Sequence, residues 1–208
     1  QFPLAAWRRA LDVACASGSS ALAYGEPSGE PALRRAIARY LGVARGVRCV
    51  PEQTIIPGGA QEALGLCVRL LSNPGDTAWV EDPGYRGAKA AMRAGELRIV
   101  PMRVDGQGML ASAENWQARP PRLVYTTPAH QYPLGAVLSA ARRLHLIEAA
   151  RAHGAWLIED DYDSEFRHAG EPIAAMQGLA SQGPVLYVGT FSKTMFPALR
   201  LGFLILPP

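Results

Sequence analysis

Lysine is the scarcest charged residue in this sequence. Of its 21 lysines and arginines, only Lys89 and Lys193 are lysines. The net charge is +3, and the arginines are scattered through stretches of helical pattern. We therefore expect the arginines to cover a solvated helix surface, because no basic run is long enough to follow a nucleic-acid backbone. A lysine kept in such a chain is a candidate for chemistry that arginine cannot perform.

Cysteine is rare as well, and long apolar runs are absent. The spacing of Cys15, Cys49 and Cys67 fits neither a metal site nor a disulfide framework, so we interpret them as thiols in a reducing cytoplasm. No apolar run approaches the roughly 20 residues of a membrane span, and no signal peptide is visible. These absences predict a cytoplasmic protein with no metal site and no membrane partner. Because the chain starts without Met and ends at LILPP, we expect it to be a piece of something longer.

Short β-rich runs alternate with helical patterns after residue 50. The runs cover residues 54–57, 77–81, 97–101, 122–126, 155–160, 185–189 and 200–206. Several are continuously apolar, as expected of strands that are buried on both faces. The alternation predicts an α/β fold with three layers (αβα) and a mostly parallel seven-stranded sheet. Only about ten residues separate the last two runs, too few for a helical crossover, so the last strand should be antiparallel.

Capping residues mark the ends of two predicted helices. Pro31 suits the first turn of one helix and Gly46 its end, while Ser139 and Gly154 fit the start and end of another. The first of these helices precedes the alternation. We therefore interpret residues 1–50 as an N-terminal arm and helix, and residues 51–208 as the main domain.

Polar and aromatic residues gather after the predicted strands. In an open α/β sheet, ligands bind at the carboxyl ends of the parallel strands. The segments at these ends are GGAQEA (58–63), DPGYRG (82–87), TPAHQYPLG (127–135), DDYDSEF (160–166) and TFSK (190–193). This regional pattern predicts one binding site at that edge of the sheet.

Two of these segments allow several interpretations. The glycine turn at 58–63 lies where a strand leads into a helix, which suits a phosphate but is equally typical of a plain tight turn. It matches neither a dinucleotide fingerprint nor a Walker loop. Asp160 and Asp161 follow an apolar strand, where a carboxylate needs a partner to offset desolvation. A helix cap, a magnesium ligand or a partner for a cationic ligand nitrogen would each fit.

Lys193 stands at the end of another apolar run. A single lysine is usually a solvated charge. A partly desolvated amine near other cations, however, becomes a nucleophile toward carbonyls and forms Schiff bases, which arginine does not. Arg200 follows seven residues later and could bind an anion bidentately.

Taken together, these motifs resemble those of fold-type I pyridoxal 5′-phosphate (PLP) enzymes of the class I/II aminotransferase group. The longer stretches are similar to the MocR branch of GntR-type transcriptional regulators, and the resemblance covers essentially the whole chain. They are YGEPSGEPALRRAIARYL, TPAHQYPLGAVLSAARRL, WLIEDDYDSEFRH and YVGTFSKTMFPALRLGFLI. The resemblance implies the large domain of a PLP-dependent transferase fold, in a homodimer. An N-terminal winged helix and a C-terminal small domain would lie outside this sequence.

The resemblance also implies roles for individual residues. Lys193 would form a Schiff base with the PLP aldehyde, Asp160 would pair with the pyridine N–H, and Tyr162 would lie near the phenolic oxygen O3′. Tyr85 would stack on the ring, and Tyr24 would reach the phosphate of the partner subunit. The expected phosphate contacts are Gly59, Ala60, Gln61, Thr190, Ser192 and Arg200.

One motif departs from the aminotransferase pattern. Aminotransferases commonly carry Asn-Pro-x-Gly, whose Asn contacts O3′, but Tyr132 stands at the Asn place here. His130 or Gln131 would then replace that contact. The arginine that grips a substrate carboxylate belongs, by resemblance, beyond Pro208, so we do not expect these 208 residues to turn over amino acids.

The functional hypothesis that follows is a PLP-binding effector domain. It would sense an amine, an amino acid or PLP itself through Lys193, and DNA would be bound only by the winged helix. The alternative is a fragment of a catalytic class I/II aminotransferase. A third possibility is a nucleotide-binding module that uses the glycine turn for a different phosphate and has no role for Lys193.

Overall fold

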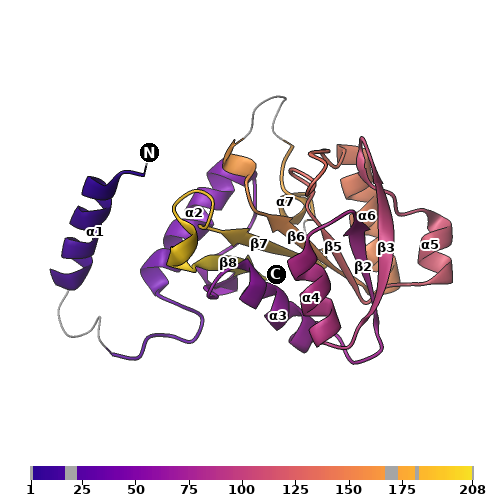
Figure 1. Ribbon diagram of the computed structural model, residues 1–208, viewed down its shortest axis with the longest axis horizontal. Coiled ribbons are helices and arrows are strands. Elements are labelled where there is room, and N and C mark those ends of the chain that lie inside the picture. Colours follow the sequence, from indigo (N-terminus) through magenta and orange to yellow (C-terminus); the bar gives the residue numbers. More distant parts are fainter. Residues whose placement is uncertain (1, 17–22, 167–172, 181–182, 208) are drawn as a thin grey trace.

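A single mixed sheet organises the structure (Figure 1). The computed structural model describes residues 2–16, 23–166, 173–180 and 183–207. In this part of the chain, the sheet order is β1-β8-β7-β6-β5-β2-β3-β4. The strands are β1 (Thr54–Ile55), β2 (Thr77–Asp82), β3 (Arg98–Asp105), β4 (Gly108–Met109), β5 (Leu123–Thr126), β6 (Trp156–Asp161), β7 (Val185–Thr190) and β8 (Gly202–Ile205).

The strand directions confirm the predicted α/β class and correct one detail. The strands β3, β2, β5, β6 and β7 are parallel neighbours, and β8 is antiparallel to both β7 and β1, as expected of the last strand. The prediction of seven strands was wrong, because the described residues form eight. The extra strand, β4, pairs antiparallel with β3. In the turn between them, the Asp105 side chain accepts the Gln107 N–H at 2.8 Å. Two residues are too few to give a detectable alternation of apolar and polar side chains.

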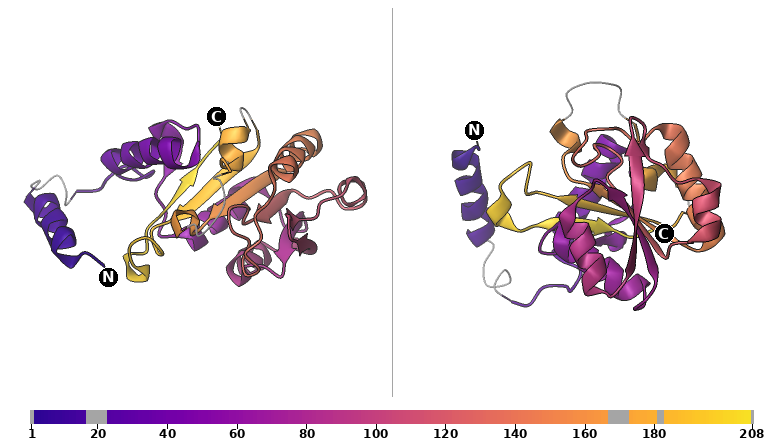
Figure 2. Two further views of the ribbon diagram at one scale, coloured as in Figure 1. Left: turned by 90° about the horizontal axis from the view of Figure 1, so that it is seen from above. Right: turned by 45° about the vertical axis from the view of Figure 1, so that its right-hand side comes forward.

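Helices cover both faces of the sheet. α3 and α4 cover one face, while α2, α6 and α7 cover the other, with α5 at its far end (Figures 1 and 2). The helices are α1 (Leu4–Ala16), α2 (Pro31–Arg45), α3 (Ala60–Leu71), α4 (Arg86–Ala94), α5 (Ala113–Ala118), α6 (Ala140–His153) and α7 (Met176–Leu179); short 3₁₀ turns occupy Pro51–Gln53, Ser164–Phe166 and Pro197–Leu199. The three predicted layers are therefore present.

The predicted capping residues stand at both ends of α2 and α6. Pro31 opens α2, and Gly46 ends it in the left-handed conformation with φ 65°. The Ser139 hydroxyl accepts the Arg142 N–H at the start of α6, and Gly154 ends that helix with φ 65°. Local sequence therefore sets where these two helices begin and end.

Alternation along the central strands divides the core into two. On β7, Leu186 and Val188 face α3 and α4, whereas Val185 and Tyr187 face the opposite helices. Adjacent residues at a strand end consequently point to opposite faces of the sheet. This rule places the functional side chains described below.

α1 lies apart from the α/β body (Figures 1 and 2). None of its residues is buried. Phe2 and Trp7 contact the ring of Phe196, with centroids 5.1 Å and 5.4 Å away. Within the described ranges, no helix has the length and apolar character that a membrane crossing requires.

Candidate functional site

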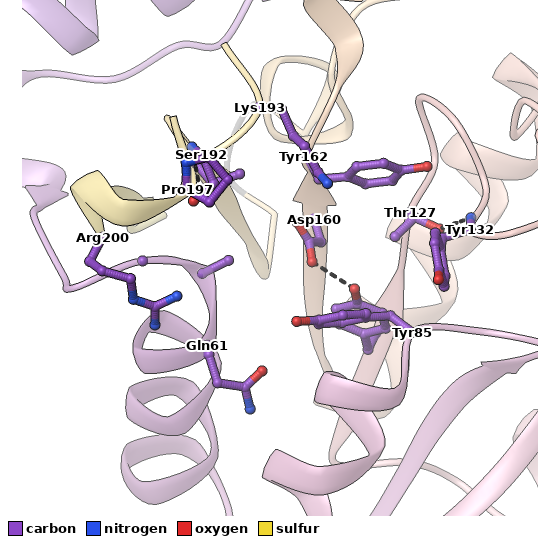
Figure 3. A pocket seen from close by; sticks show the side chains of 14 residues that line it. Gln61, Tyr85, Thr127, Tyr132, Asp160, Tyr162, Ser192, Lys193, Pro197 and Arg200 are labelled. Carbon is purple, nitrogen blue, oxygen red and sulfur yellow. Dashed lines mark hydrogen bonds between the residues drawn. The ribbon is translucent and has the colours of Figure 1, made fainter. Parts of the chain in front are cut away.

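A cavity of about 350 Å³ opens at the carboxyl ends of the central parallel strands (Figure 3). Its walls come from five places far apart in the sequence. The lining residues are Gly59, Ala60, Gln61, Tyr85, Tyr125, Thr127, Tyr132, Asp160, Tyr162, Thr190, Ser192, Lys193, Pro197 and Arg200. The lining includes every residue predicted for the site except Tyr24, His130 and Gln131.

Asp160 forms the buried end of the cavity. It lies on β6, is only 4% exposed and points to the side of the sheet covered by α3 and α4. The Tyr125 hydroxyl on β5 donates to Asp160 Oδ2 at 2.6 Å. The other oxygen, Oδ1, is buried and has no partner among the described residues. One lone-pair position is thus free for a donor from a ligand.

The surroundings of Asp160 favour its neutral form in the ligand-free protein. Burial raises the pKa of Asp160 to about 7, although the hydrogen bond from Tyr125 acts against the rise. The nearby carboxylates of Asp161, Glu81 and Asp163 add to it. A cationic group beside Oδ1 would reverse this balance, because an opposite charge favours the carboxylate.

The other end of the cavity is suited to an anion. Gly59 is the N-cap of α3, with a φ of 104° that favours glycine, and it has no side chain to cap the first turn of the helix. Arg200 adopts the left-handed conformation with φ 50°, and its guanidinium lies within 4.0 Å of the point that a Cβ on Gly59 would occupy. Thr190 and Ser192 hydrogen-bond to each other at 3.0 Å beside this end. Free N–H groups, hydroxyls and a guanidinium therefore converge on one place.

Lys193 lies between these two ends, at the exposed rim (Figure 3). It follows β7 and, within the described part of the chain, makes no salt bridge. Lys89, the other lysine, is held on the surface by Asp82 at 2.5 Å. Lys193 therefore lines the cavity, whereas Lys89 is paired with a carboxylate outside it.

Three tyrosine rings line the wall beside Asp160. Tyr132 stands edge-on to Tyr85, at 6.1 Å, and to Tyr162, at 6.2 Å. Burial, together with the Asp163 and Asp160 carboxylates, raises the pKa of Tyr162. The Tyr162 phenol is therefore protonated near neutral pH and can donate a hydrogen bond.

The structure places the three remaining predicted residues outside the lining. His130 Nδ1 lies 2.6 Å from Asp163 Oδ2, and its ring stacks on Tyr162 at 6.1 Å. The Gln131 amide is buried and donates to Glu81 Oε2 at 3.2 Å and to the Pro83 carbonyl at 2.9 Å. Tyr24 is fully exposed.

Sequence reasoning gave no role to four lining residues. Tyr132 was noted only as the replacement for an asparagine, and Tyr125, Thr127 and Pro197 were not singled out. The signal for Tyr125 was available, because it is the second-last residue of β5 and pairs with Ile158, two residues before Asp160. A side chain on the neighbouring strand, on the same face, is a natural partner for a strand-end acid.

Comparisons with known proteins identify the family of the chain. The family model for aminotransferase class I and II matches residues 1–208. The probable rhizopine catabolism regulatory protein MocR of Rhizobium meliloti is 44% identical over all of this chain, which covers 42% of that relative. The uncharacterized HTH-type transcriptional regulator YhdI of Bacillus subtilis is 40% identical, again over all of the chain and 44% of the relative. The chain thus spans less than half the length of these curated relatives.

A solved structure has the same fold and a larger chain. The crystal structure of Pyrococcus horikoshii kynurenine aminotransferase, in complex with PMP, matches with a TM-score of 0.89 and 32% identity. The match covers 100% of this chain and 53% of the other. The chain therefore belongs to the aminotransferase class I and II family, and its sequence is similar throughout to MocR-type regulators.

Proposed function

We propose that this chain is the PLP-binding effector domain of a longer MocR-type transcriptional regulator. The observation that carries the proposal is the order of groups across one cavity: an anion site, a lysine and a buried carboxylate with one free oxygen. PLP has a matching sequence of groups, namely a phosphate, an aldehyde and a basic ring nitrogen. When bound, it would supply an electron sink for an attached amine.

The anion end fits a phosphate in both charge and shape. Arg200 offers a fork of N–H donors beside Gly59, where the absence of a side chain leaves the first turn of α3 open. Thr190 and Ser192 add hydroxyl donors. These groups would hold the cofactor at one end and so fix its distance from Lys193.

The acid end fits a protonated ring nitrogen. Asp160 Oδ1 is buried without a partner, a state that carries a desolvation penalty. A cationic N–H would satisfy this oxygen and stabilise the ionised carboxylate, while Tyr125 holds the other oxygen. Tyr85 would then lie against the ring, and Tyr132 or Tyr162 would donate to its phenolic oxygen.

Lys193 supplies the nucleophile. Its amine lies at the rim, where an incoming amine or amino acid could compete with it for the same aldehyde. A ligand that binds one conformation more tightly than another shifts the population toward it. We infer that this exchange is the sensed event and that a winged helix outside these residues would carry the response to DNA.

The proposed assembly is a homodimer in which Tyr24 reaches the partner's phosphate site. Tyr24 is fully exposed, and α1 nearby buries none of its residues. An amphipathic helix of this length gains most of its stability from packing, so both features favour a partner. Light scattering should report a dimer whose PLP affinity falls in Tyr24→Phe. A monomer that binds PLP with undiminished affinity would contradict the arrangement.

A catalytic fragment is the second candidate, favoured by the similarity to kynurenine aminotransferase. Transamination requires Lys193 as a base and also an arginine that orients the substrate carboxylate. Among the described lining residues, Arg200 is the sole arginine, and it belongs to the anion end. The described residues therefore favour binding over turnover.

One experiment tests the proposal and separates the two candidates. The protein is mixed with PLP, reduced with borohydride and digested for peptide mapping, with Lys193→Ala and Lys89→Ala as matched variants. We expect the label on Lys193 in the parent and in Lys89→Ala, and none in Lys193→Ala. A label on Lys89 alone, or none in the parent, would refute PLP binding at this site. Rapid, stoichiometric conversion of bound PLP to pyridoxamine phosphate (PMP) on addition of amino acids would favour the catalytic function over the sensory one.

A further inference from the structure

A buried ion pair lies behind the cofactor site, on the opposite face of the sheet. Arg45 Nε donates to Asp161 Oδ2 at 2.7 Å, and the two side chains are only 5% and 1% exposed. The Tyr187 hydroxyl on β7 donates to the same oxygen at 2.5 Å. No residue of this group lines the cavity.

The backbone holds Arg45 at this position. It is the last residue of α2, and its carbonyl accepts the Ala175 N–H at 3.0 Å. Gly178 on α7 lies against the next residue so closely that a Cβ there would be 1.9 Å from the Gly46 carbonyl oxygen. The end of α2 is thus fixed against α7, and Arg45 has a defined place over the end of β6.

Asp161 is the chain neighbour of Asp160, and the two carboxylates point to opposite faces of β6. Their positions follow from the register, in which Asp160 pairs with Val188 and Asp161 with Gly189. Two acids this close in a buried strand affect each other electrostatically, because the protein interior screens charge poorly. Any group that neutralises Asp161 therefore also acts on Asp160.

The other ionisable groups around the two acids are mostly acidic. Those that interact with Asp160 are Tyr125 on β5, Glu81 on β2, Asp163 and Tyr162 after β6, and Tyr85 before α4. Those that interact with Asp161 are Arg45 and Tyr40 on α2, Tyr187 on β7 and Glu159 on β6 itself. Within the described residues, Arg45 is the cation that contacts either of the two adjacent acids.

We propose that Arg45 is a positioning residue of the cofactor site: by neutralising Asp161 from behind the sheet, it keeps Asp160 available as a carboxylate for a cationic ligand nitrogen. The inference rests on the proposed function for the identity of that ligand. The electrostatic link itself is a property of the protein without any ligand. It gives helix α2 a direct influence on the chemistry of the cavity.

The direction of the pKa shifts supports this link. After burial and the Tyr125 hydrogen bond, the Asp161 charge is the next influence on Asp160, and it raises the pKa. Burial lowers the pKa of Arg45, but the Asp161 carboxylate and Tyr187 outweigh it and raise that pKa above its ordinary value. Arg45 therefore stays charged across the whole range in which Asp160 titrates.

The test is a charge cycle read by carbon-13 NMR of the aspartate carboxyl groups, in protein without cofactor. Asp160→Asn identifies the Asp160 signal by its disappearance. We expect Arg45→Met to raise the midpoint of the Asp160 titration, and Asp161→Asn to lower it, each by on the order of one pH unit. Arg34→Met is the matched control, because Arg34 lies on the same helix and pairs with Glu26 at 2.7 Å, away from the cavity. Its Asp160 midpoint should equal that of the parent.

The design remains decisive if Arg45→Met does not fold. The double variant Arg45→Met/Asp161→Asn leaves no unpaired charge, and its Asp160 midpoint should lie on the order of one pH unit above that of Asp161→Asn alone. Equal midpoints in these two variants would overturn the proposal. Failure of the parent to take up PLP would refute the proposed function but would leave this titration result intact.

Discussion

Glu159 and Asp160 are adjacent on the same strand, are both buried, and differ in how fully they are bonded. Glu159 accepts the Met176 N–H at 2.9 Å and the Gln177 N–H at 3.0 Å, and Arg143 lies 4.0 Å away. Asp160 has one bonded oxygen and one free oxygen. Burial is the first cause that raises the pKa of each to about 7.

This difference separates a structural acid from a binding acid. Glu159 faces α6 and α7 and ties helix α7 to the sheet through two N–H groups. Asp160 faces the cavity, and nothing in the described fold uses its second oxygen. Burial alone does not distinguish these two acids, but their hydrogen bonding does. A buried carboxylate oxygen without a hydrogen-bond partner is costly and needs an explanation, so it indicates a binding role.

Removal of the structural acid should have the largest effect. Glu159→Ala leaves the two buried N–H groups of Met176 and Gln177 without their acceptor and removes the carboxylate that lies 4.0 Å from Arg143, so we expect a loss of about 3–5 kcal/mol of unfolding free energy. Urea unfolding at pH 8 measures it. Asp160→Ala is the matched comparison and should lose far less. Equal losses in the two variants would contradict the distinction.

Removal of the binding acid should stabilise the cofactor-free protein. The folded-state pKa of Asp160, about 7, lies above its ordinary value, so its neutral form is compatible with folding at low pH. Stability is then lost as pH rises from about 4 toward 7, because the unfolded state ionises first. Asp160→Asn avoids this loss and should be more stable than the parent by about 2–4 kcal/mol at pH 8. Thermal unfolding at pH 4 and pH 8 should show the difference only at the higher pH.

The same substitution should weaken cofactor binding. A charge-assisted hydrogen bond contributes about 1.5–3 kcal/mol, so Asp160→Asn should lower PLP affinity roughly 10–100-fold. Absorbance titration with PLP measures the change. Asp105→Asn is the control, since Asp105 pairs with Arg142 and lies outside the cavity lining. An unchanged PLP affinity in Asp160→Asn would mean that another acid pairs with the ring nitrogen.

The smallest expected effect concerns the partner of Asp160. The Tyr125 hydroxyl donates to Oδ2 and lowers the pKa of Asp160, so Tyr125→Phe should raise that pKa further. PLP affinity should fall as pH drops below the Asp160 midpoint, and in Tyr125→Phe this fall should begin about one pH unit higher. Superimposable pH profiles for variant and parent would mean that Tyr125 has no electrostatic role.

Much of the site could be predicted from the sequence because it lies at strand ends. Gly59, Asp160 and Lys193 each follow an apolar run, and parallel strands bring their carboxyl ends to one edge of the sheet. The glycine turn and the Ser-Lys pair depend on local backbone, which short motifs encode. The helix caps at Gly46 and Gly154 were predictable for the same reason.

The remainder depends on contacts between distant residues. Arg45 and Asp161 are 116 positions apart, and no local pattern links them. Gln131 was predicted as a cofactor contact, but its amide donates to the buried Glu81 carboxylate. The same carboxylate accepts the Thr127 hydroxyl at 2.7 Å, so the two residues share one buried acceptor. Tyr125 lies inside β5, and the pairing of β5 with β6 brings its hydroxyl to Asp160. Tertiary packing settles which side chains reach the cavity, and local sequence patterns do not reveal that packing.

The most direct test of the account is nitrogen-15 NMR of PLP labelled in its ring and bound to the parent and to Asp160→Asn. If the free oxygen of Asp160 holds the ring nitrogen, the parent should show the chemical shift of a protonated pyridine near pH 8. Asp160→Asn should show that of an unprotonated one. A protonated shift in both proteins, or an unprotonated shift in both, would contradict the assignment of Asp160 as the binding acid.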